Sequence, residues 1–254
     1  MMQLLAAGFA GMYTAAWGAY KDAPFERFSR ASFWRSLAFS LAIALALAFS
    51  GRLTGLHAVE AFFLVMGLER LAIEIYKPCF RREDQSKYLI PQDFSFFGVH
   101  VGGRKRLWLA GGAMIALVSW LVTRPLPITG YAAHLGVACA VGLFIACGGA
   151  AKDAPWEGFD VLKFPRSIWV LALASPLLAA LGPRPIGLLV FMYGGVERML
   201  VEGYKTYFTT KPPGKFRRDL PVIDHRFLAW RPVLRAMAVA IVTTVAAWYV
   251  AAAA

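Results

Sequence analysis

The sequence predicts an all-α, polytopic membrane protein of about eight transmembrane helices, arranged as two tandem parallel four-helix repeats. Three observations lead to this prediction: apolar blocks of membrane-spanning length, basic residues concentrated in alternate connections, and two charged phrases that each occur twice. Hydrophobic residues make up 59% of the 254-residue chain and charged residues only 17%, whereas soluble domains carry about 25% charged residues.

Most of the apolar blocks approach the roughly 20 residues that a helix needs to cross a bilayer. Their apolar residues are continuous rather than alternating, which indicates helices and not the strands of a barrel. The first block lacks a basic start, and its end GAYKDAP reappears as GAAKDAP within the chain, so we interpret it as a structural helix rather than a signal peptide. The expected spans are residues 2–20, 37–51, 56–76, 107–123, 128–151, 168–182, 185–204 and 233–253.

The basic residues predict the orientation of the chain. Nearly all of the 27 lysines and arginines lie in or beside the connections that follow the first, third, fifth and seventh spans, whereas the opposite connections hold only Arg52, Arg124 and Arg184. The basic connections are therefore expected to be cytoplasmic, with both termini outside. We expect the inner membrane of a prokaryote, because no transit segment is evident. The net charge of +12 is then mainly an orientation signal, and membrane lipids rather than nucleic acid are the expected partners. No pattern indicates an oligomeric state.

Two phrases recur in the same order, which predicts a duplicated unit. GAYKDAPFERFSRASFWRS at 18–36 matches GAAKDAPWEGFDVLKFPRS at 149–167 in eleven of 19 positions. GLERLAIEIYKPCF at 67–80 matches GVERMLVEGYKTYF at 195–208 in seven of 14 positions. The expected repeats are residues 1–124 and 125–254. Because each holds an even number of spans, both enter the membrane in the same sense, and we expect a pseudo-two-fold axis along the membrane normal.

The first phrase follows the first span of each repeat and carries charged side chains to the cytoplasmic membrane surface. We expect Pro24 and Pro155 to end their helices, because proline disfavours the α conformation in the residue before it. The charged residues that match between the two copies are Lys21, Asp22, Glu26 and Arg35, and Lys152, Asp153, Glu157 and Arg166.

The second phrase lies within the third and seventh spans, where an ionisable side chain is costly and indicates a functional site. Within each copy, the arginine, the second glutamate and the lysine are spaced i, i+4 and i+7, so they share one helix face. The first glutamate points about 100° away, and we expect the buried charges to pair with the first phrase. These residues are Glu69, Arg70, Glu74 and Lys77, and Glu197, Arg198, Glu202 and Lys205.

Carboxylates beside arginines and lysines suit a metal–phosphate group. Mg²⁺ and other hard divalent cations bind carboxylate oxygens, while arginine and lysine bind phosphate. We therefore predict that the charged residues that match between the copies of the two phrases bind ligand, with Asp22, Glu69, Asp153 and Glu197 as metal ligands and Mg²⁺ as the candidate cofactor.

Three functions remain open at this point. The first is a transporter or channel-like protein that binds a phosphate-bearing or metal-complexed solute, or a lipid headgroup, at symmetric charged sites. The second is a Mg²⁺-dependent membrane enzyme acting on a phosphorylated lipid. The third is a non-catalytic structural subunit of a membrane complex. An enzyme needs one active site, whereas a shared site would keep both copies of the charges, so we favour transport.

Overall fold

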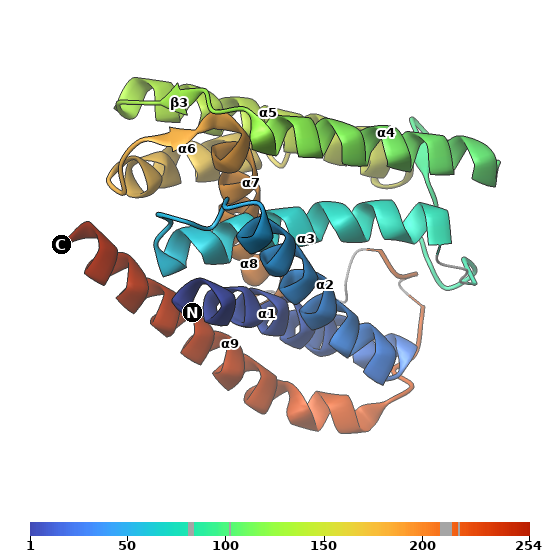
Figure 1. The fold of residues 1–254 in the computed structure, drawn as a ribbon. Coiled ribbons are helices and arrows are strands. Elements are labelled where there is room, and N and C mark those ends of the chain that lie inside the picture. Colours follow the sequence, from blue (N-terminus) through green and yellow to red (C-terminus); the bar gives the residue numbers. More distant parts are fainter. Residues whose placement is uncertain (81–83, 102, 209–214, 218) are drawn as a thin grey trace. The chain divides into compact units, whose positions relative to one another are not determined.

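The chain folds almost entirely into helices (Figure 1). The structure, a computed structural model, describes residues 1–80, 84–101, 103–208, 215–217 and 219–254. The helices are α1 (Met2–Glu26), α2 (Arg30–Phe49), α3 (Ala58–Phe80), α4 (Arg104–Thr123), α5 (Tyr131–Glu157), α6 (Arg166–Ala179), α7 (Ile186–Glu197), the π-helix η1 (Arg198–Glu202), α8 (Gly203–Tyr207) and α9 (His225–Ala253). Two short antiparallel pairings occur among the described residues: β1 (Ser95–Phe96) and β2 (Val99–His100) form a hairpin, whereas β3 (Pro127–Ile128) pairs with β4 (Arg184–Pro185) across the intervening helices α5 and α6.

Four of the described helices are long and apolar enough to cross a membrane: α2, α4, α5 and α9. A fifth, α6, is apolar but shorter. The exposed surfaces of the long helices carry large apolar side chains such as Leu45, Ile115, Phe144 and Val239, which water would not favour. These features make the chain a membrane protein, as the sequence predicts.

The chain forms two compact units, and both draw on each half of the sequence. Unit 1 contains Met1–Arg70, Gly194–Pro213 and Asp219–Ala254, and unit 2 contains Leu71–Tyr193 and Gly214–Arg218. The expected repeats, residues 1–124 and 125–254, are duplicated stretches of sequence and do not need to coincide with compact units. The duplication therefore stays a prediction.

Unit 1 is built around α1, which packs against both α2 and α9. A Cβ atom on Gly11 would lie 2.7 Å from the Cα atom of Leu37, so only glycine allows α1 and α2 to come this close. The α9 helix runs back along α1: the rings of Phe9 and Trp248 lie 5.5 Å apart, and the Asp224 N–H donates to the Pro24 carbonyl at the other end of α1 (3.1 Å).

Unit 2 contains an equivalent pair of helices, α5 and α6, which lie side by side. A Cβ atom on Gly142 would lie 2.6 Å from the Cα atom of Ile168. Gly142 and Ile168 each lie 131 residues after Gly11 and Leu37, which is the offset between the two copies of the first phrase. The close helix crossing therefore occurs at matching positions of the sequence in both units.

The helices α1 and α5 continue past the prolines that we expected to end them. Both helices include their proline and end two residues later, at Glu26 and Glu157. A proline in the last turn removes only one hydrogen bond, and the chain turns away at the next residue instead. That residue is Arg27 (φ 65°, ψ 155°) after α1 and Gly158 (φ 83°, ψ 160°) after α5.

Arg27 occupies a conformation that is normally restricted to glycine, and it costs a residue with a Cβ atom about 1–3 kcal/mol. We expect Arg27→Gly to raise the free energy of unfolding by about 1 kcal/mol relative to Arg27→Ala, which removes the same charge but keeps the Cβ atom. Thermal unfolding in detergent, followed by tryptophan fluorescence, measures the difference. Gly158→Ala should lower stability in the same assay. Equal stability of the glycine and alanine variants at position 27 would contradict this expectation.

Candidate functional site

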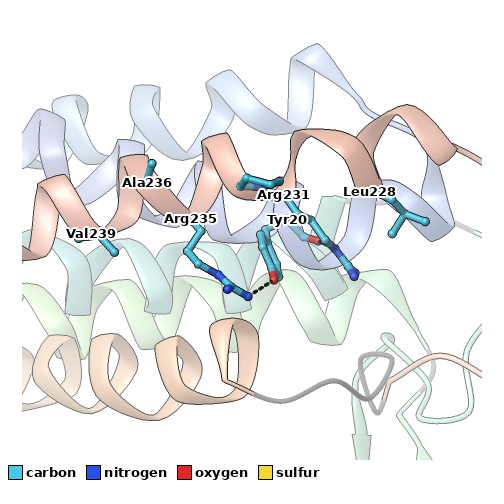
Figure 2. Close-up of a pocket in the computed structure, with 7 residues that line it drawn as sticks. Tyr20, Leu228, Arg231, Arg235, Ala236 and Val239 are labelled. Carbon is cyan, nitrogen blue, oxygen red and sulfur yellow. Dashed lines mark hydrogen bonds between the residues drawn. The ribbon is translucent and has the colours of Figure 1, made fainter.

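A pocket of about 540 Å³ lies on unit 1, where α9 packs against α1 (Figure 2). It is lined by Tyr20 of α1, Arg231 and Arg235 of α9, and apolar residues of α9 that include Leu228, Ala236 and Val239. None of the predicted site residues lines it. The sequence held one signal for this pocket: two arginines four residues apart at the start of the last apolar block share one helix face.

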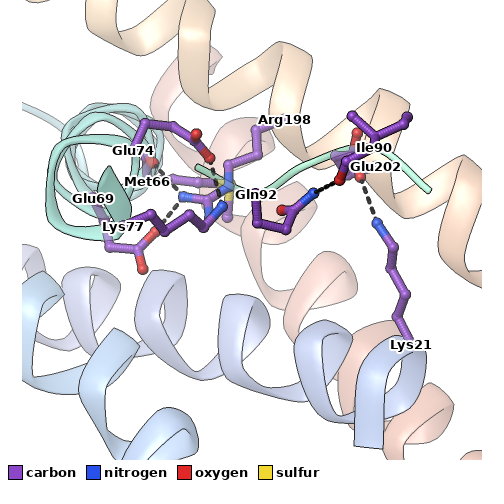
Figure 3. A network of polar contacts seen from close by, with 9 residues as sticks. All are labelled: Lys21, Met66, Glu69, Glu74, Lys77, Ile90, Gln92, Arg198 and Glu202. Atoms are coloured by element: carbon purple, nitrogen blue, oxygen red, sulfur yellow. Dashed lines mark hydrogen bonds and ion pairs between the residues drawn. The ribbon is translucent and has the colours of Figure 1, made fainter. Parts of the chain in front are cut away.

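The predicted charges of the second phrase form reciprocal ion pairs inside unit 1. The guanidinium of Arg198 donates to the carboxylate of Glu69 and also to the Met66 carbonyl (3.2 Å), as Figure 3 shows. The guanidinium of Arg70 donates to Glu197 (2.5 Å). The glutamate of each copy thus holds the arginine of the other copy. We expected these charges to pair with the first phrase, and the structure shows in addition that the two copies of the second phrase pair with each other.

These four charges, which we call the exchange quartet (Glu69, Arg70, Glu197 and Arg198), differ in their access to solvent. The side chains of Glu69 and Glu197 are 0% and 3% exposed, and that of Arg198 is 7% exposed, whereas that of Arg70 is 31% exposed. The ring of Trp17 covers Arg198, with its centroid 4.8 Å from the guanidinium carbon. Trp17, which the sequence analysis did not single out, adds a cation–π contact to the buried pair.

The backbones of α3 and α7 come very close beside the exchange quartet. A Cβ atom on Gly195 would lie 2.0 Å from the Phe63 carbonyl oxygen, so any other residue at this position would separate the helices. The exchange of partners requires this approach, because the glutamate and the arginine of each pair must reach across from neighbouring helices. Gly195 therefore positions the site without contacting a ligand.

The two copies of the second phrase differ in backbone conformation. Residues Arg198–Glu202 form the π-helix η1, whereas the equivalent segment of α3 is α-helical. The Tyr13 hydroxyl reaches the Met199 carbonyl in η1 at 3.5 Å, and a Cβ atom on Gly203 would lie 2.7 Å from that hydroxyl oxygen. Single π turns within helices are frequent at functional sites, and here the turn carries two of the predicted residues.

A lysine of the first phrase also meets the second phrase in unit 1. The Glu202 carboxylate accepts hydrogen bonds from Lys21 (3.4 Å) and Lys205 (2.8 Å), and Figure 3 shows the Lys21 contact. Lys21 comes from the first copy of its phrase, whereas Glu202 and Lys205 come from the second copy of theirs. The expected pairing between the two phrases is therefore present here, but it joins opposite copies.

In unit 2, too, a lysine of the first phrase lies near charged residues of the second phrase. The Glu74 carboxylate accepts a hydrogen bond from Lys77 (2.7 Å), and Lys152 lies near enough for its charge to act on Lys77. Lys152 belongs to the second copy of the first phrase, and Glu74 and Lys77 belong to the first copy of the second phrase. Unit 1 thus combines the first copy of the first phrase with the second copy of the second phrase, and it also contains Glu69 and Arg70 of the other copy. Unit 2 combines the second copy of the first phrase with the rest of the first copy of the second phrase.

The remaining predicted residues lie near helix ends. Asp22, Glu26 and Asp153 are half-buried, whereas Glu157 is exposed and accepts a hydrogen bond from Lys163 (2.7 Å). Arg35, on the second turn of α2, and Arg166, the first residue of α6, are half-buried.

Magnesium binding stays a prediction. Of the four predicted metal ligands, Glu69 and Glu197 hold arginines, and Asp22 and Asp153 belong to different units. Within the described parts of the chain, no three histidine, cysteine, aspartate or glutamate side chains are grouped so that they could hold a metal ion.

Comparison with protein-family models, curated proteins and solved structures finds no match for this chain. Function is therefore inferred from the residues and their contacts.

Substitution in the Glu69–Arg198 pair should lower the free energy of unfolding far more than substitution of Arg70 in the other pair. Arg198→Met leaves the Glu69 charge buried and uncompensated, and it should cost about 3–5 kcal/mol of stability. The double variant Glu69→Leu/Arg198→Met removes both charges and should recover most of that loss, while Arg70→Met, whose side chain is partly exposed, should cost less. Thermal unfolding and gel filtration in detergent measure these effects. A double variant no more stable than Arg198→Met would show that the two side chains are not coupled.

Proposed function

We propose that the chain is an integral membrane transporter or channel-like protein that binds a phosphate-bearing or metal-complexed solute, or a lipid headgroup, near the cytoplasmic side of the membrane. In this proposal eight spans form two tandem parallel repeats about a pseudo-two-fold axis along the membrane normal. The basic connections face the cytoplasm, the termini face outside, and the membrane is the inner membrane of a prokaryote.

Matching contacts at matching positions support the duplicated architecture. Gly11 crosses Leu37 as Gly142 crosses Ile168, and the offset is the same in each case. The reciprocal pairing in the exchange quartet is the contact that a two-fold axis generates, because residue i of one copy meets residue j of the other and the reverse.

The exchange quartet is the observation that carries the functional proposal. In the proposed eight-span topology α3 and α7 cross the membrane, and ionisable residues within membrane helices are costly and mark ligand or ion pathways. A buried ion pair often stabilises a protein no more than apolar side chains of similar size would, so stability alone does not explain why both copies retain one. One shared cluster, rather than two separate ones, also fits transport better than catalysis.

A phosphate-bearing ligand can enter this cluster by competition. A phosphate group offers arginine the same two-oxygen geometry as a carboxylate and carries more negative charge. Arg70 is the natural point of entry, because its partly exposed guanidinium can turn from Glu197 to a ligand with little loss of burial. Rebinding of Glu197 would then release the ligand.

The second candidate function is that of a non-catalytic structural subunit, in which the exchange quartet only holds helices together. We call this role the structural clasp, and one observation favours it. The Glu69–Arg198 pair is almost completely buried and makes direct contact, with a further bond to the Met66 carbonyl. A pair of this kind can serve to fix the register of two helices, without binding any ligand.

The proposed topology predicts that equivalent positions of the two repeats face one compartment. In a background without native cysteines, Arg30→Cys and Val161→Cys, both on exposed residues, should react with a membrane-impermeant maleimide only from the cytoplasmic side. Leu126→Cys, in an opposite connection, should react only from outside. Modification of positions 30 and 161 from opposite sides would rule out parallel repeats.

The transport proposal predicts that substitutions of Arg70 and of Glu197 have opposite effects on the binding of phosphate. Inorganic phosphate, with and without MgCl₂, should raise the Tm of the purified protein. Arg70→Gln should abolish this shift, whereas Glu197→Gln should keep or enlarge it, because the substitution frees Arg70. Glu60→Gln, a change of a buried carboxylate on the same helix away from the quartet, is the matched control and should respond like the wild type.

The same variants separate transport from the clasp. Glu69→Gln and Glu197→Gln should still fold but should release ligand more slowly and impair activity. If both variants instead lose detergent-stable protein and phosphate shifts the Tm of none of them, the clasp is correct and the transport proposal is wrong.

A further inference from the structure

We propose that the pocket formed by Tyr20, Arg231 and Arg235 binds the phosphate of an anionic phospholipid, whose acyl chains lie along α9. This site shares no residue with the exchange quartet, and the inference does not depend on the transport proposal. It rests on the charge, the hydrogen-bonding capacity and the surroundings of the pocket.

Two positive charges meet in this pocket without a carboxylate. The Arg235 guanidinium donates to the Tyr20 hydroxyl (2.9 Å) and to the Tyr207 carbonyl (3.2 Å), and the Arg231 Nε donates to the Tyr20 carbonyl (3.4 Å). Figure 2 shows the Arg235 bond to Tyr20. In the part of the chain that the structure describes, neither arginine forms an ion pair with an acidic side chain. The pocket therefore carries positive charge that no acidic side chain of the described residues neutralises, and this charge favours the binding of an anion.

The arginines are held in place rather than left to move freely. The guanidinium carbons of Arg231 and Arg235 lie 4.9 and 5.9 Å from the centre of the Tyr20 ring, and Tyr20 itself is only 7% exposed. The Tyr207 ring packs edge-on against that of Tyr20 at 5.0 Å. These contacts fix the two guanidinium groups while each keeps N–H donors that the protein does not use, since arginine carries five.

Tyr20 supplies a third donor. Its hydroxyl oxygen accepts the bond from Arg235, so its own hydrogen is available to a ligand oxygen. Pro232, which also lines the pocket, has no N–H group and leaves the Leu228 carbonyl without its usual helical partner. A headgroup hydroxyl could donate to that carbonyl. The pocket thus offers donors for a phosphate and an acceptor for a hydroxyl.

The surroundings of the pocket distinguish a lipid from a soluble phosphate. The α9 helix is one of the membrane-spanning helices, and Val233 and Val239 on either side of Arg235 are 57% and 58% exposed. Arg235 is the third residue of the expected span 233–253, and in the proposed topology it lies near the boundary between headgroups and acyl chains. An arginine exposed among apolar side chains at this depth needs an anion supplied by the membrane.

Native mass spectrometry of the purified full chain tests the proposal. The probes are phosphatidylglycerol and phosphatidylcholine with identical dioleoyl chains, which differ in headgroup charge and hydroxyl groups. We expect the wild-type protein to retain phosphatidylglycerol at least tenfold more strongly than phosphatidylcholine. Arg231→Gln/Arg235→Gln should abolish this preference, and Tyr20→Phe, which keeps the ring but removes the donor, should weaken it several-fold.

The matched control is Arg226→Gln on the same helix. Arg226 is exposed, and its Nε and Nη2 atoms already bind the two oxygens of Asp224 (3.0 and 3.1 Å), so its loss should leave the lipid preference unchanged. If the double variant does not fold, the wild type still decides the question, because a charge-based preference must fall as NaCl is raised. Equal retention of the two lipids by the wild type would overturn the proposal. Displacement of phosphatidylglycerol by millimolar inorganic phosphate would also overturn it, since the ligand would then be a soluble phosphate.

Discussion

The exchange of partners between two glutamate–arginine pairs is the constraint on which unit 1 depends. Glu69 and Glu197 are almost completely removed from solvent, and an isolated carboxylate in such surroundings would be neutralised or would unfold the helix pair. Each needs an arginine within hydrogen-bond reach. Because the arginines follow the glutamates directly in the sequence, only one alignment of α3 with α7 and η1 satisfies both pairs. The charges therefore specify the register of the helices more strongly than apolar packing does.

That register in turn requires particular small and aromatic residues around it. Gly195 permits the backbone approach to Phe63, and Gly203 leaves room for the Tyr13 hydroxyl beside η1. Trp17 covers Arg198, so α1 is tied to the same cluster that joins α3 to α7. A larger residue at Gly195 would push the backbones of α3 and α7 apart, whereas one at Gly203 would displace the Tyr13 hydroxyl. The ion pairs therefore form only where the helices pack closely, and this close packing requires the small residues beside them.

The sequence predicted the helices and the charged residues better than it predicted their partners. Apolar block length indicates where helices lie, because it reflects the thickness of the bilayer directly. The partner of a buried charge depends on which helices are neighbours, and periodicity within one helix carries no such information. The expected contact between phrases does occur at Lys21 and Glu202, but the copies are exchanged. The extension of α1 beyond Pro24, the strained Arg27 and the π turn likewise depend on packing that no local pattern encodes.

The two ion pairs of the quartet contain the same residue types but differ in exposure to solvent. This difference makes one pair less costly to separate than the other. Arg198 is buried beneath Trp17, the residue before the first copy of the first phrase, whereas the equivalent residue before the second copy is Gly148. Arg70 keeps 31% of its side chain exposed, so breaking its pair restores hydration to a group that is already partly hydrated. Breaking the Arg198 pair leaves two dry charges apart, which costs far more. The Arg70–Glu197 pair is therefore the less costly of the two to separate, and loss of the Glu69–Arg198 pair should weaken the contact between the helices more.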